Sequence, residues 1–349
     1  MTTAIDGRGD AAAFTAFQRA AWSNLVLSVT QRCPLSCRHC ITNSTNGAGL
    51  PVLAVEQAQA WAAELPGLRR AGLTHLTFTG GEPTLARAAV AVLAGAARDA
   101  GIATSIVTSG AFARSPAAAT RCVDLLSDVR DWDFGYDVYH AEHLPLELFG
   151  AAVVAARDAG HPVSVRVCLG DAETSTLLER LSAICGPGVP IITQSVRRLG
   201  RAGTLPGATH SHPPPAACPS SGPLVREDGS VAPCCAGLAY PRRDHLPFRF
   251  GNAVTDGLTA VWHAWREDQA LRLMRLAGLT PVIGWLRAKG LPAPSPAGDV
   301  CELCTGMWDR GGRAAAAVAA HTRQPEVREK LDLLEKHLYG AVWKPADTP

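Results

Sequence analysis

The chain has 349 residues, of which 47% are hydrophobic, and a formal net charge of +2 at pH 7. This length and apolar content are enough to bury a full core, so the composition predicts a globular protein with one large domain and an appendage. A net charge so close to zero gives no reason to expect a nucleic acid or an anionic membrane surface as partner.

Targeting signals and cysteine usage indicate the compartment. The first 23 residues hold no apolar stretch behind a basic start, and no later stretch reaches the about 20 apolar residues that span a bilayer. We therefore expect a cytoplasmic protein with no membrane partner. Its 11 cysteines exceed what packing requires. Because cytosolic thiols stay reduced, we expect metal or cluster ligation rather than disulfides.

Short β-rich runs alternate with helical patterns between residues 24 and 203. We predict strands at 24–30, 74–80, 102–108, 132–138, 162–169 and 190–196. Most of these runs are continuously apolar, as in strands buried on both faces, and the segments between them show the 3.6-residue period of helices. Six βα units predict an α/β fold, a partial (β/α)6 TIM-like barrel with its site at the carboxyl ends of the strands.

The remaining segments divide the chain further. Residues 1–23 form an N-terminal extension, and residues 204–217 form a proline-rich linker that suits neither a helix nor a central strand. We expect a smaller domain over 218–310, opening with a hairpin that turns at Gly229, and a helical tail over 311–349.

Three cysteines follow the first predicted strand in the motif C-P-L-S-C-R-H-C. Cys33, Cys37 and Cys40 lie within eight residues on a loop at the carboxyl end of the strand. Such a loop can place three thiolates on one face of a metal cluster. Three ligands for a four-iron cluster leave one iron open to a substrate or cofactor. The alternative is a structural zinc site that takes His39 as its fourth ligand.

The C-x3-C-x2-C spacing resembles the signature of radical S-adenosylmethionine (SAM) enzymes, in which the open iron chelates the amino and carboxylate groups of SAM. The second predicted strand ends in Gly80, Gly81, Glu82 and Pro83. This segment is similar to the GGEP segment of that family, in which the glycines let the backbone approach the SAM amino group and the glutamate lies close by. A zinc site predicts no such segment, so the two motifs together favour the radical SAM interpretation.

The resemblance implies further cofactor contacts. His39 occupies the slot where the family prefers an aromatic ring whose backbone faces the adenine, and Ser109 lies where the family often has Thr-Asn-Gly. Arg166 resembles the arginine that pairs with the SAM carboxylate. Asp137 belongs to a segment that resembles Ser-x-Asp-Gly, but Gly135 replaces the serine, so the hydroxyl of that serine is missing here.

A second group of cysteines lies in the C-terminal part. Cys218, Cys234, Cys301 and Cys304 follow the pattern C-x10-G-x4-C and C-x2-C, which resembles the twitch form of the SPASM extension of radical SAM enzymes. The resemblance implies an auxiliary [4Fe-4S] cluster with four thiolate ligands, which would relay electrons or stabilise the domain. A zinc ribbon is the alternative.

Cys235 is beside a predicted ligand. Three interpretations of Cys235 are open. It replaces Cys234 as a cluster ligand, or it donates a hydrogen atom to a substrate radical, as in the radical SAM epimerases that this chain resembles. The third interpretation is an inert thiol beside the ligand. We interpret Cys122, Cys168 and Cys185 as packing residues. The charged run that begins at His140 follows the fourth strand, where acid–base groups are useful, although such runs are more often solvated loops.

The resemblance also implies the reaction. Reductive cleavage of SAM gives methionine and a 5′-deoxyadenosyl radical that abstracts a hydrogen atom from the substrate, with a flavodoxin- or ferredoxin-type electron donor as partner. By family frequency we expect a ribosomally synthesised peptide that is epimerised or cross-linked. The alternative substrate is a sugar or aminocyclitol that is dehydrogenated or epimerised. A hypothesis of another class is a non-catalytic metal-binding scaffold, which predicts zinc and no SAM turnover.

Overall fold

The computed structural model describes residues 11–169, 174–197, 199–205, 218, 220–236, 247–294, 300–308 and 312–340. Most of the predicted linker at 204–217 is outside these residues. Among the described helices, none is both long and apolar enough to cross a bilayer.

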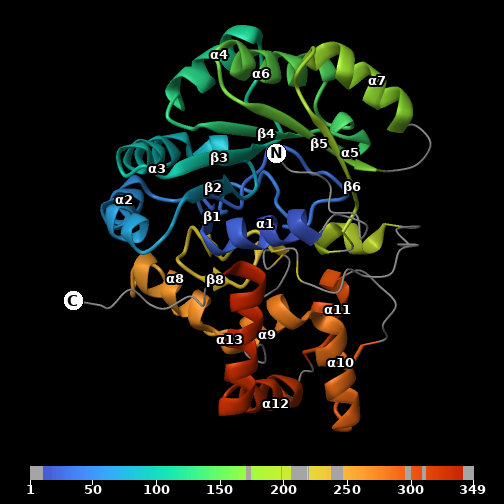
Figure 1. Cartoon of the computed structure of the whole chain (residues 1–349). Coiled ribbons are helices and arrows are strands. Elements are labelled where there is room, and N and C mark those ends of the chain that lie inside the picture. Colours follow the sequence, from blue (N-terminus) through green and yellow to red (C-terminus); the bar gives the residue numbers. More distant parts are fainter. Residues whose placement is uncertain are drawn as a thin grey trace.

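One sheet organises the molecule (Figure 1). Its strands follow the order β6-β5-β4-β3-β2-β1-β7-β8. Their bounds are β1 (Asn24–Ser28), β2 (His75–Thr79), β3 (Ala103–Thr108), β4 (Asp131–Gly135), β5 (Val163–Leu169), β6 (Ile191–Ser195), β7 (Leu224–Arg226) and β8 (Val231–Ala232). Strands β1 to β6 pair in parallel in chain order. Each predicted strand coincides with one of these six, and because β6 and β1 are not neighbours the barrel is open, which confirms the predicted fold class.

Helices connect the parallel strands. They are α2 (Val55–Arg70), α3 (Arg87–Asp99), α4 (Pro116–Leu125), α5 (Val138–Ala141), α6 (Leu146–Asp158) and α7 (Thr174–Cys185), with the short 3-10 helices η1 (Pro83–Ala86) and η2 (Gly200–Thr204). Helix α2 packs on α3, and α4 packs on α6. Their apolar faces bury one side of the sheet, including Leu76, Phe78, Ile106 and Phe134.

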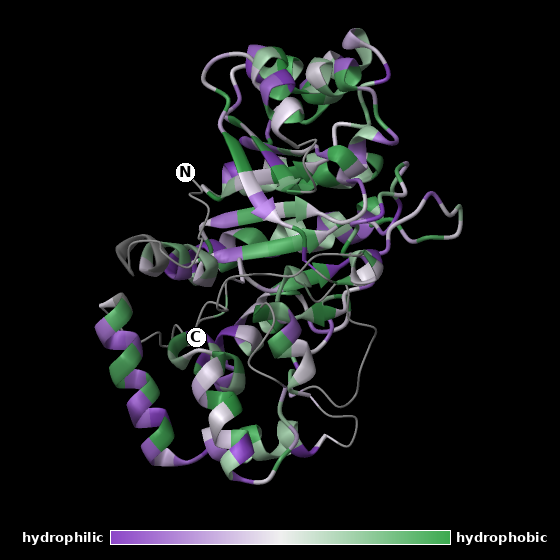
Figure 2. Ribbon diagram, turned by 90° about the vertical axis from the view of Figure 1, so that its right-hand side faces the viewer, coloured by the Kyte–Doolittle hydropathy of each residue, from purple (hydrophilic) through white to green (hydrophobic). Residues whose placement is uncertain are grey.

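The strands differ from the sequence prediction in one respect. Only β1 is buried along its whole length, whereas β2, β3 and β4 alternate buried and half-buried residues. Figure 2 shows this alternation as hydrophilic bands on the strands. The prediction of burial on both faces was therefore wrong for these strands, because the open barrel leaves its concave face lined by polar side chains. On that face His75 bonds Ser105, and Ser105 bonds Thr77.

The predicted hairpin is formed by β7 and β8, which pair antiparallel around Gly229, whose φ is +78°. Strand β7 also pairs in parallel with β1, so the hairpin extends the barrel sheet. Beyond it lie α8 (Leu258–Glu267), α9 (Gln269–Ala277), α10 (Leu279–Ala288), α11 (Val300–Gly306), α12 (Arg313–Thr322) and α13 (Pro325–Tyr339). These helices share a second apolar core, and α1 (Ala11–Trp22) joins it through an edge-to-face contact of Trp22 with Trp265 at 4.9 Å.

Candidate metal centre and cofactor site

The loop after β1 brings three thiols together at the carboxyl edge of the sheet. Its backbone is held where Cys33 N donates to Thr45 O at 2.9 Å and Cys40 N donates to Cys37 O at 3.2 Å. Burial first, and then the charges of Glu82 and of the other two thiols, raise the pKa of Cys33 to about 12. Burial likewise raises the pKa of Cys37 to about 12. Thiols so placed stay protonated unless a metal cation binds them, so this donor set fits a cluster with three protein ligands.

Gly80 and Gly81 let the end of β2 lie directly against the cysteine loop. Gly81 N donates to Thr30 O at 2.7 Å. Gly80 has φ +138°, and a Cβ atom there would lie 2.3 Å from Thr30 O. A Cβ atom on Gly81 would lie 2.1 Å from Arg32 O. The glycines are therefore required for the backbone of this chain itself, in addition to any approach of a cofactor.

Glu82 is a fully buried carboxylate that joins the ends of β2 and β3. Its Oε1 accepts hydrogen bonds from Thr84 N, from Thr84 Oγ1 at 2.8 Å and from Thr108 Oγ1 at 2.7 Å. Its Oε2 accepts from Ser109 N at 3.0 Å and Ser109 Oγ at 2.6 Å. Both predicted contact residues, Glu82 and Ser109, thus bond each other, and Pro83 begins the following 3-10 helix η1. Glu82 sets the relative position of two strand ends beside the thiols.

We expect Glu82→Gln to lower the free energy of unfolding by about 2–4 kcal/mol, because an amide turns N–H groups toward donors and leaves buried hydrogen-bonding groups unsatisfied. Urea unfolding of the purified protein measures this loss. Glu56→Gln, at an exposed position of α2, is the control, with an expected change within about 0.5 kcal/mol. Equal stability of the two variants would contradict the inferred bracing by Glu82.

Asp137 is a buried carboxylate shared by two histidines. Its Oδ2 lies 3.1 Å from His39 Nε2, and its Oδ1 lies 2.9 Å from His140 Nδ1. Burial alone would raise the pKa of Asp137, but the hydrogen bonds and charges of His140 and His39 outweigh it and hold this pKa well below its usual range. The ring of His39 stacks on Tyr139 at 4.7 Å. His140 is therefore part of the site and not of a solvated loop.

The two histidines also bear on the predicted cofactor contacts. His39 Nδ1 is buried without a hydrogen-bond partner among the described residues, so it is available to a bound molecule. A Cβ atom on Gly135 would lie 3.7 Å from His140 Cε1. The ring of His140 thus adjoins the space beside Gly135, the position where the resembling segment has its serine. The i, i+3 spacing of Asp137 and His140 at the start of α5 is the sequence signal for this pair.

Arg166 and Cys168 lie on the concave face of the sheet. Arg166 Nε forms an ion pair with Asp133 of the neighbouring strand β4. Cys168 Sγ accepts a hydrogen bond from Gln194 Nε2 at 3.4 Å, and the ligand atoms of Cys168, Asp137 and His39 lie within 4.8 Å of one another. The interpretation of Cys168 as a packing residue was therefore wrong. In β5 the buried residues alternate with half-buried ones, so the two-residue period places Cys168 on the same face as Arg166.

Arg201 of η2 forms hydrogen bonds to the backbone of the cysteine loop. It was not identified as a site residue from the sequence. Its Nε donates to Cys37 O at 3.0 Å, its Nη1 donates to Ser44 O at 2.8 Å, and its backbone N donates to Cys40 O at 3.0 Å. Gly200 beside it comes so close that a Cβ atom would lie 2.6 Å from the carbonyl oxygen of Ile41. These contacts join residues that are distant in the chain, so no local sequence pattern predicts them.

We expect Arg201→Met to release iron about tenfold faster to a chelator, because supporting contacts of metal ligands contribute about 10–100-fold to metal affinity. Methionine keeps an unbranched apolar stem but loses both guanidinium hydrogen bonds. The rate of iron transfer to a coloured chelator under anaerobic conditions measures the effect. Arg328→Met on the exposed face of α13 is the control, and an equal rate in both variants would refute the clamping by Arg201.

The C-terminal cysteines also lie near one another. The pKa of Cys234 is raised well above its ordinary value by burial first, and then by the charges of four other thiols, those of Cys235, Cys218, Cys301 and Cys304. Cys234 follows β8, whereas Cys301 and Cys304 are one turn apart on α11. The carbonyl oxygen of Cys218 accepts from Gln18 Nε2 of α1 at 2.5 Å. Four other thiols thus lie near enough for their charges to influence Cys234, and four thiolates suffice for a cluster or for zinc.

A family model described as the Radical SAM superfamily matches residues 27–137. The matched stretch contains all three cysteines of the first loop, the Gly80-Gly81-Glu82 segment and Asp137. No curated protein matches the chain.

Solved structures of three proteins show similarity to the chain. The structure of BtrN in complex with AdoMet and 2-DOIA has 16% sequence identity to this chain. The aligned part covers 73% of this chain and 87% of the BtrN chain, with a TM-score of 0.43. The structure of native anSMEcpe with bound AdoMet has 12% sequence identity to this chain. The aligned part covers 89% of this chain and 99% of the anSMEcpe chain, with a TM-score of 0.49. HydG, a maturase of the [FeFe]-hydrogenase, has 11% sequence identity to this chain. The aligned part covers 96% of this chain and 88% of the HydG chain, with a TM-score of 0.35.

Proposed function

Because the chain belongs to the radical SAM superfamily, we propose that it is an enzyme that reductively cleaves SAM at a [4Fe-4S] cluster. Cys33, Cys37 and Cys40 hold this cluster, and the radical formed from SAM abstracts a hydrogen atom from the substrate. The observation that carries this proposal is the position of three thiols on one loop at the carboxyl edge of the sheet, which the Gly80-Gly81 segment touches through its backbone. When bound, the reduced cluster and SAM supply the hydrogen-abstracting radical.

The side chains of the concave face supply binding and orientation. Among the described residues, Asp133 engages only Nε of Arg166. This leaves the two terminal nitrogens of the guanidinium for a ligand carboxylate, for which their planar geometry is suited. Asp137 holds the rings of His39 and His140 in fixed orientations. We therefore assign Arg166 to the carboxylate end of SAM, and the Asp137–His39 pair to its adenosine end.

Anaerobic reconstitution with iron and sulfide tests this function. The reconstituted protein is mixed with SAM and reduced methyl viologen, and 5′-deoxyadenosine is measured by chromatography and mass spectrometry. Formation of 5′-deoxyadenosine supports the proposal. Protein that holds only zinc at its first cysteine loop and leaves SAM intact would establish the non-catalytic scaffold instead.

We propose a peptide as the substrate, which is epimerised or cross-linked. Support comes from β6, which is an edge strand of the sheet with β5 as its neighbour. The outer side of such a strand can pair with an extended peptide through backbone hydrogen bonds. Candidate precursor peptides incubated in deuterated water would gain one deuterium on epimerisation or lose two hydrogens on cross-linking. Turnover of a sugar or aminocyclitol, with every peptide unchanged, would favour the small-molecule alternative.

We further propose that Cys218, Cys234, Cys301 and Cys304 hold an auxiliary [4Fe-4S] cluster. The influence of the charges of Cys218, Cys301 and Cys304 on Cys234 supports this ligand set, and Cys235 is left as the fifth thiol. We expect Cys304→Ser to lower the iron content from about eight to about four per chain. Cys235→Ala is the matched control and should keep about eight. If both variants lost the same amount, Cys235 would be a ligand, and bound zinc in place of iron would overturn the auxiliary cluster.

A further inference from the structure

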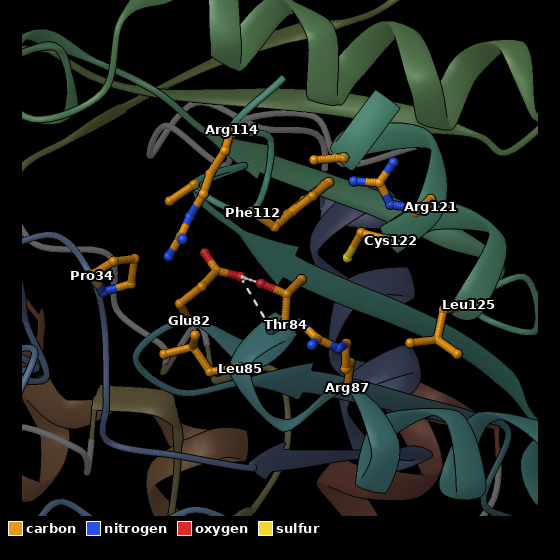
Figure 3. A pocket seen from close by; sticks show the side chains of 12 residues that line it. Pro34, Glu82, Thr84, Leu85, Arg87, Phe112, Arg114, Arg121, Cys122 and Leu125 are labelled. Atoms are coloured by element: carbon orange, nitrogen blue, oxygen red, sulfur yellow. Dashed lines mark hydrogen bonds between the residues drawn. The ribbon is translucent and has the colours of Figure 1, made fainter. Parts of the chain in front are cut away.

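A pocket lies between α3 and α4, on the helix-covered side of the sheet at its carboxyl edge (Figure 3). Its volume is about 500 Å³. One wall comes from the segment between β2 and α3 and another from α4. The apolar residues of its lining include Leu85, Phe112, Leu125 and Pro34 of the cysteine loop. No residue of the concave face described above, such as Arg166 or Cys168, lines this pocket.

Three arginines give the pocket a concentrated positive charge. Arg87 begins α3, Arg114 lies in the loop after β3, and Arg121 lies on α4, and all three are exposed. Among the described residues, none of them has an ion-pair partner or a side-chain hydrogen bond. The one carboxylate of the lining, Glu82, is buried and already accepts its hydrogen bonds from threonine and serine residues.

Several other arginines of the barrel have carboxylate partners. Arg38 pairs with Glu142 at 2.5 Å, and Arg157 pairs with Asp158 at 2.8 Å. The three pocket arginines differ from these in having no carboxylate partner among the described residues. Three exposed like charges around one concavity attract a polyanionic partner over a distance of about 8 Å at physiological ionic strength.

The pocket also adjoins the first cysteine loop. Pro34 is the residue directly after Cys33, so a molecule seated against Pro34 is next to a proposed ligand of the cluster. It reaches that place from the outside of the sheet, while the concave face stays open to SAM and substrate. An electron can thus enter from one side of the loop and be used on the other.

We propose that the pocket of Arg87, Arg114 and Arg121 is the docking site for an acidic one-electron donor protein of the flavodoxin or ferredoxin type. The inference rests on the proposed function, because it assigns a surface to the reductant that radical SAM chemistry requires. In the step, the donor protein loses one electron and the cluster gains it, and no atoms are exchanged. The partner is recognised by its carboxylates, which pair with the guanidinium groups, while the apolar lining residues accommodate a small hydrophobic contact.

The test compares two reductants on the same reconstituted protein. One is a reduced acidic flavodoxin, and the other is reduced methyl viologen, a small cation that gains nothing from arginines. The variant carries Arg87→Gln, Arg114→Gln and Arg121→Gln together, and a second variant carries lysine at the same positions. The matched control removes three exposed positive charges of α13, with Arg328→Gln, Lys330→Gln and Lys336→Gln. Cluster reduction is followed by stopped-flow absorbance and SAM cleavage by 5′-deoxyadenosine.

We expect the glutamine variant to be reduced by flavodoxin at least about tenfold more slowly, with a weaker dependence on salt, since electrostatic steering raises association rates by about 10–1000-fold. Its reaction with methyl viologen should equal that of the unsubstituted protein, and the lysine and α13 variants should keep most of the flavodoxin rate. Unchanged flavodoxin kinetics in the glutamine variant would overturn the inference. So would an equal loss with both reductants. If the unsubstituted protein cleaves no SAM with methyl viologen, the proposed function itself fails.

Discussion

We expect the Cys37→Ala variant to form no measurable 5′-deoxyadenosine and to take up only the iron of the proposed auxiliary site. Cys37 is the central and most buried thiol of the first loop, and its carbonyl oxygen is held by Arg201. With two thiols left, no three-point attachment for a cluster exists. Loss of a direct ligand should exceed the about 100-fold loss that removal of a supporting contact causes. The measurements are iron content and SAM cleavage after identical reconstitution.

Cys185→Ala is the matched control for this prediction, because Cys185 is equally buried but lies on α7 in the apolar core. It should keep both its iron and its SAM cleavage, at a cost in stability of about 1 kcal/mol. If the Cys37 variant kept its activity, the proposed ligand set would be refuted. If both variants failed, the losses would reflect folding rather than ligation, and circular dichroism of the two proteins would reveal it.

We expect the Gly81→Ala variant to lose about 3 kcal/mol or more of its free energy of unfolding and to fail to assemble the proposed first cluster. The new Cβ atom would lie 2.1 Å from Arg32 O and 2.6 Å from Arg32 C, which are backbone atoms and cannot turn away. The end of β2 and the start of the cysteine loop must then separate, so the thiols lose their common position. Urea unfolding and iron content measure the two effects.

Gly284→Ala tests the same chemical change where no atom is in the way. Gly284 lies in α10, and nothing lies within 4 Å of its added Cβ atom. This variant should be more stable by about 0.5–1 kcal/mol, because alanine loses less conformational freedom than glycine in a helix. A Gly81 variant as stable as the Gly284 variant would show that the close approach of the two backbones is not required.

Local patterns predicted much of the molecule correctly. The six parallel strands and the helices between them follow from apolar period and length, and the hairpin at Gly229 follows from its turn residues. The cysteine spacing and the GGEP segment predicted the superfamily, which the family match supports. These features depend on neighbours in the chain, so a single sequence contains the information.

The contacts between distant segments could not be predicted in this way. Arg201 reaches the cysteine loop across 164 positions, and His140 joins the site only because α5 begins beside Asp137. Cys168 was misjudged because an apolar strand was taken as buried on both faces, whereas the open barrel leaves one face polar.

The sequence by itself determined the spacing of the cysteines and the order of the βα units, because bonded neighbours and periodicity decide these. The tertiary structure decided which side chains meet: the bracing of Glu82 by Thr108 and Ser109, the pairing of Arg166 with Asp133, and the arginine pocket between α3 and α4. The physical reason is that charge pairing and hydrogen bonding depend on distance in space, and only the folded sheet brings the ends of separate strands within a few ångströms of one another.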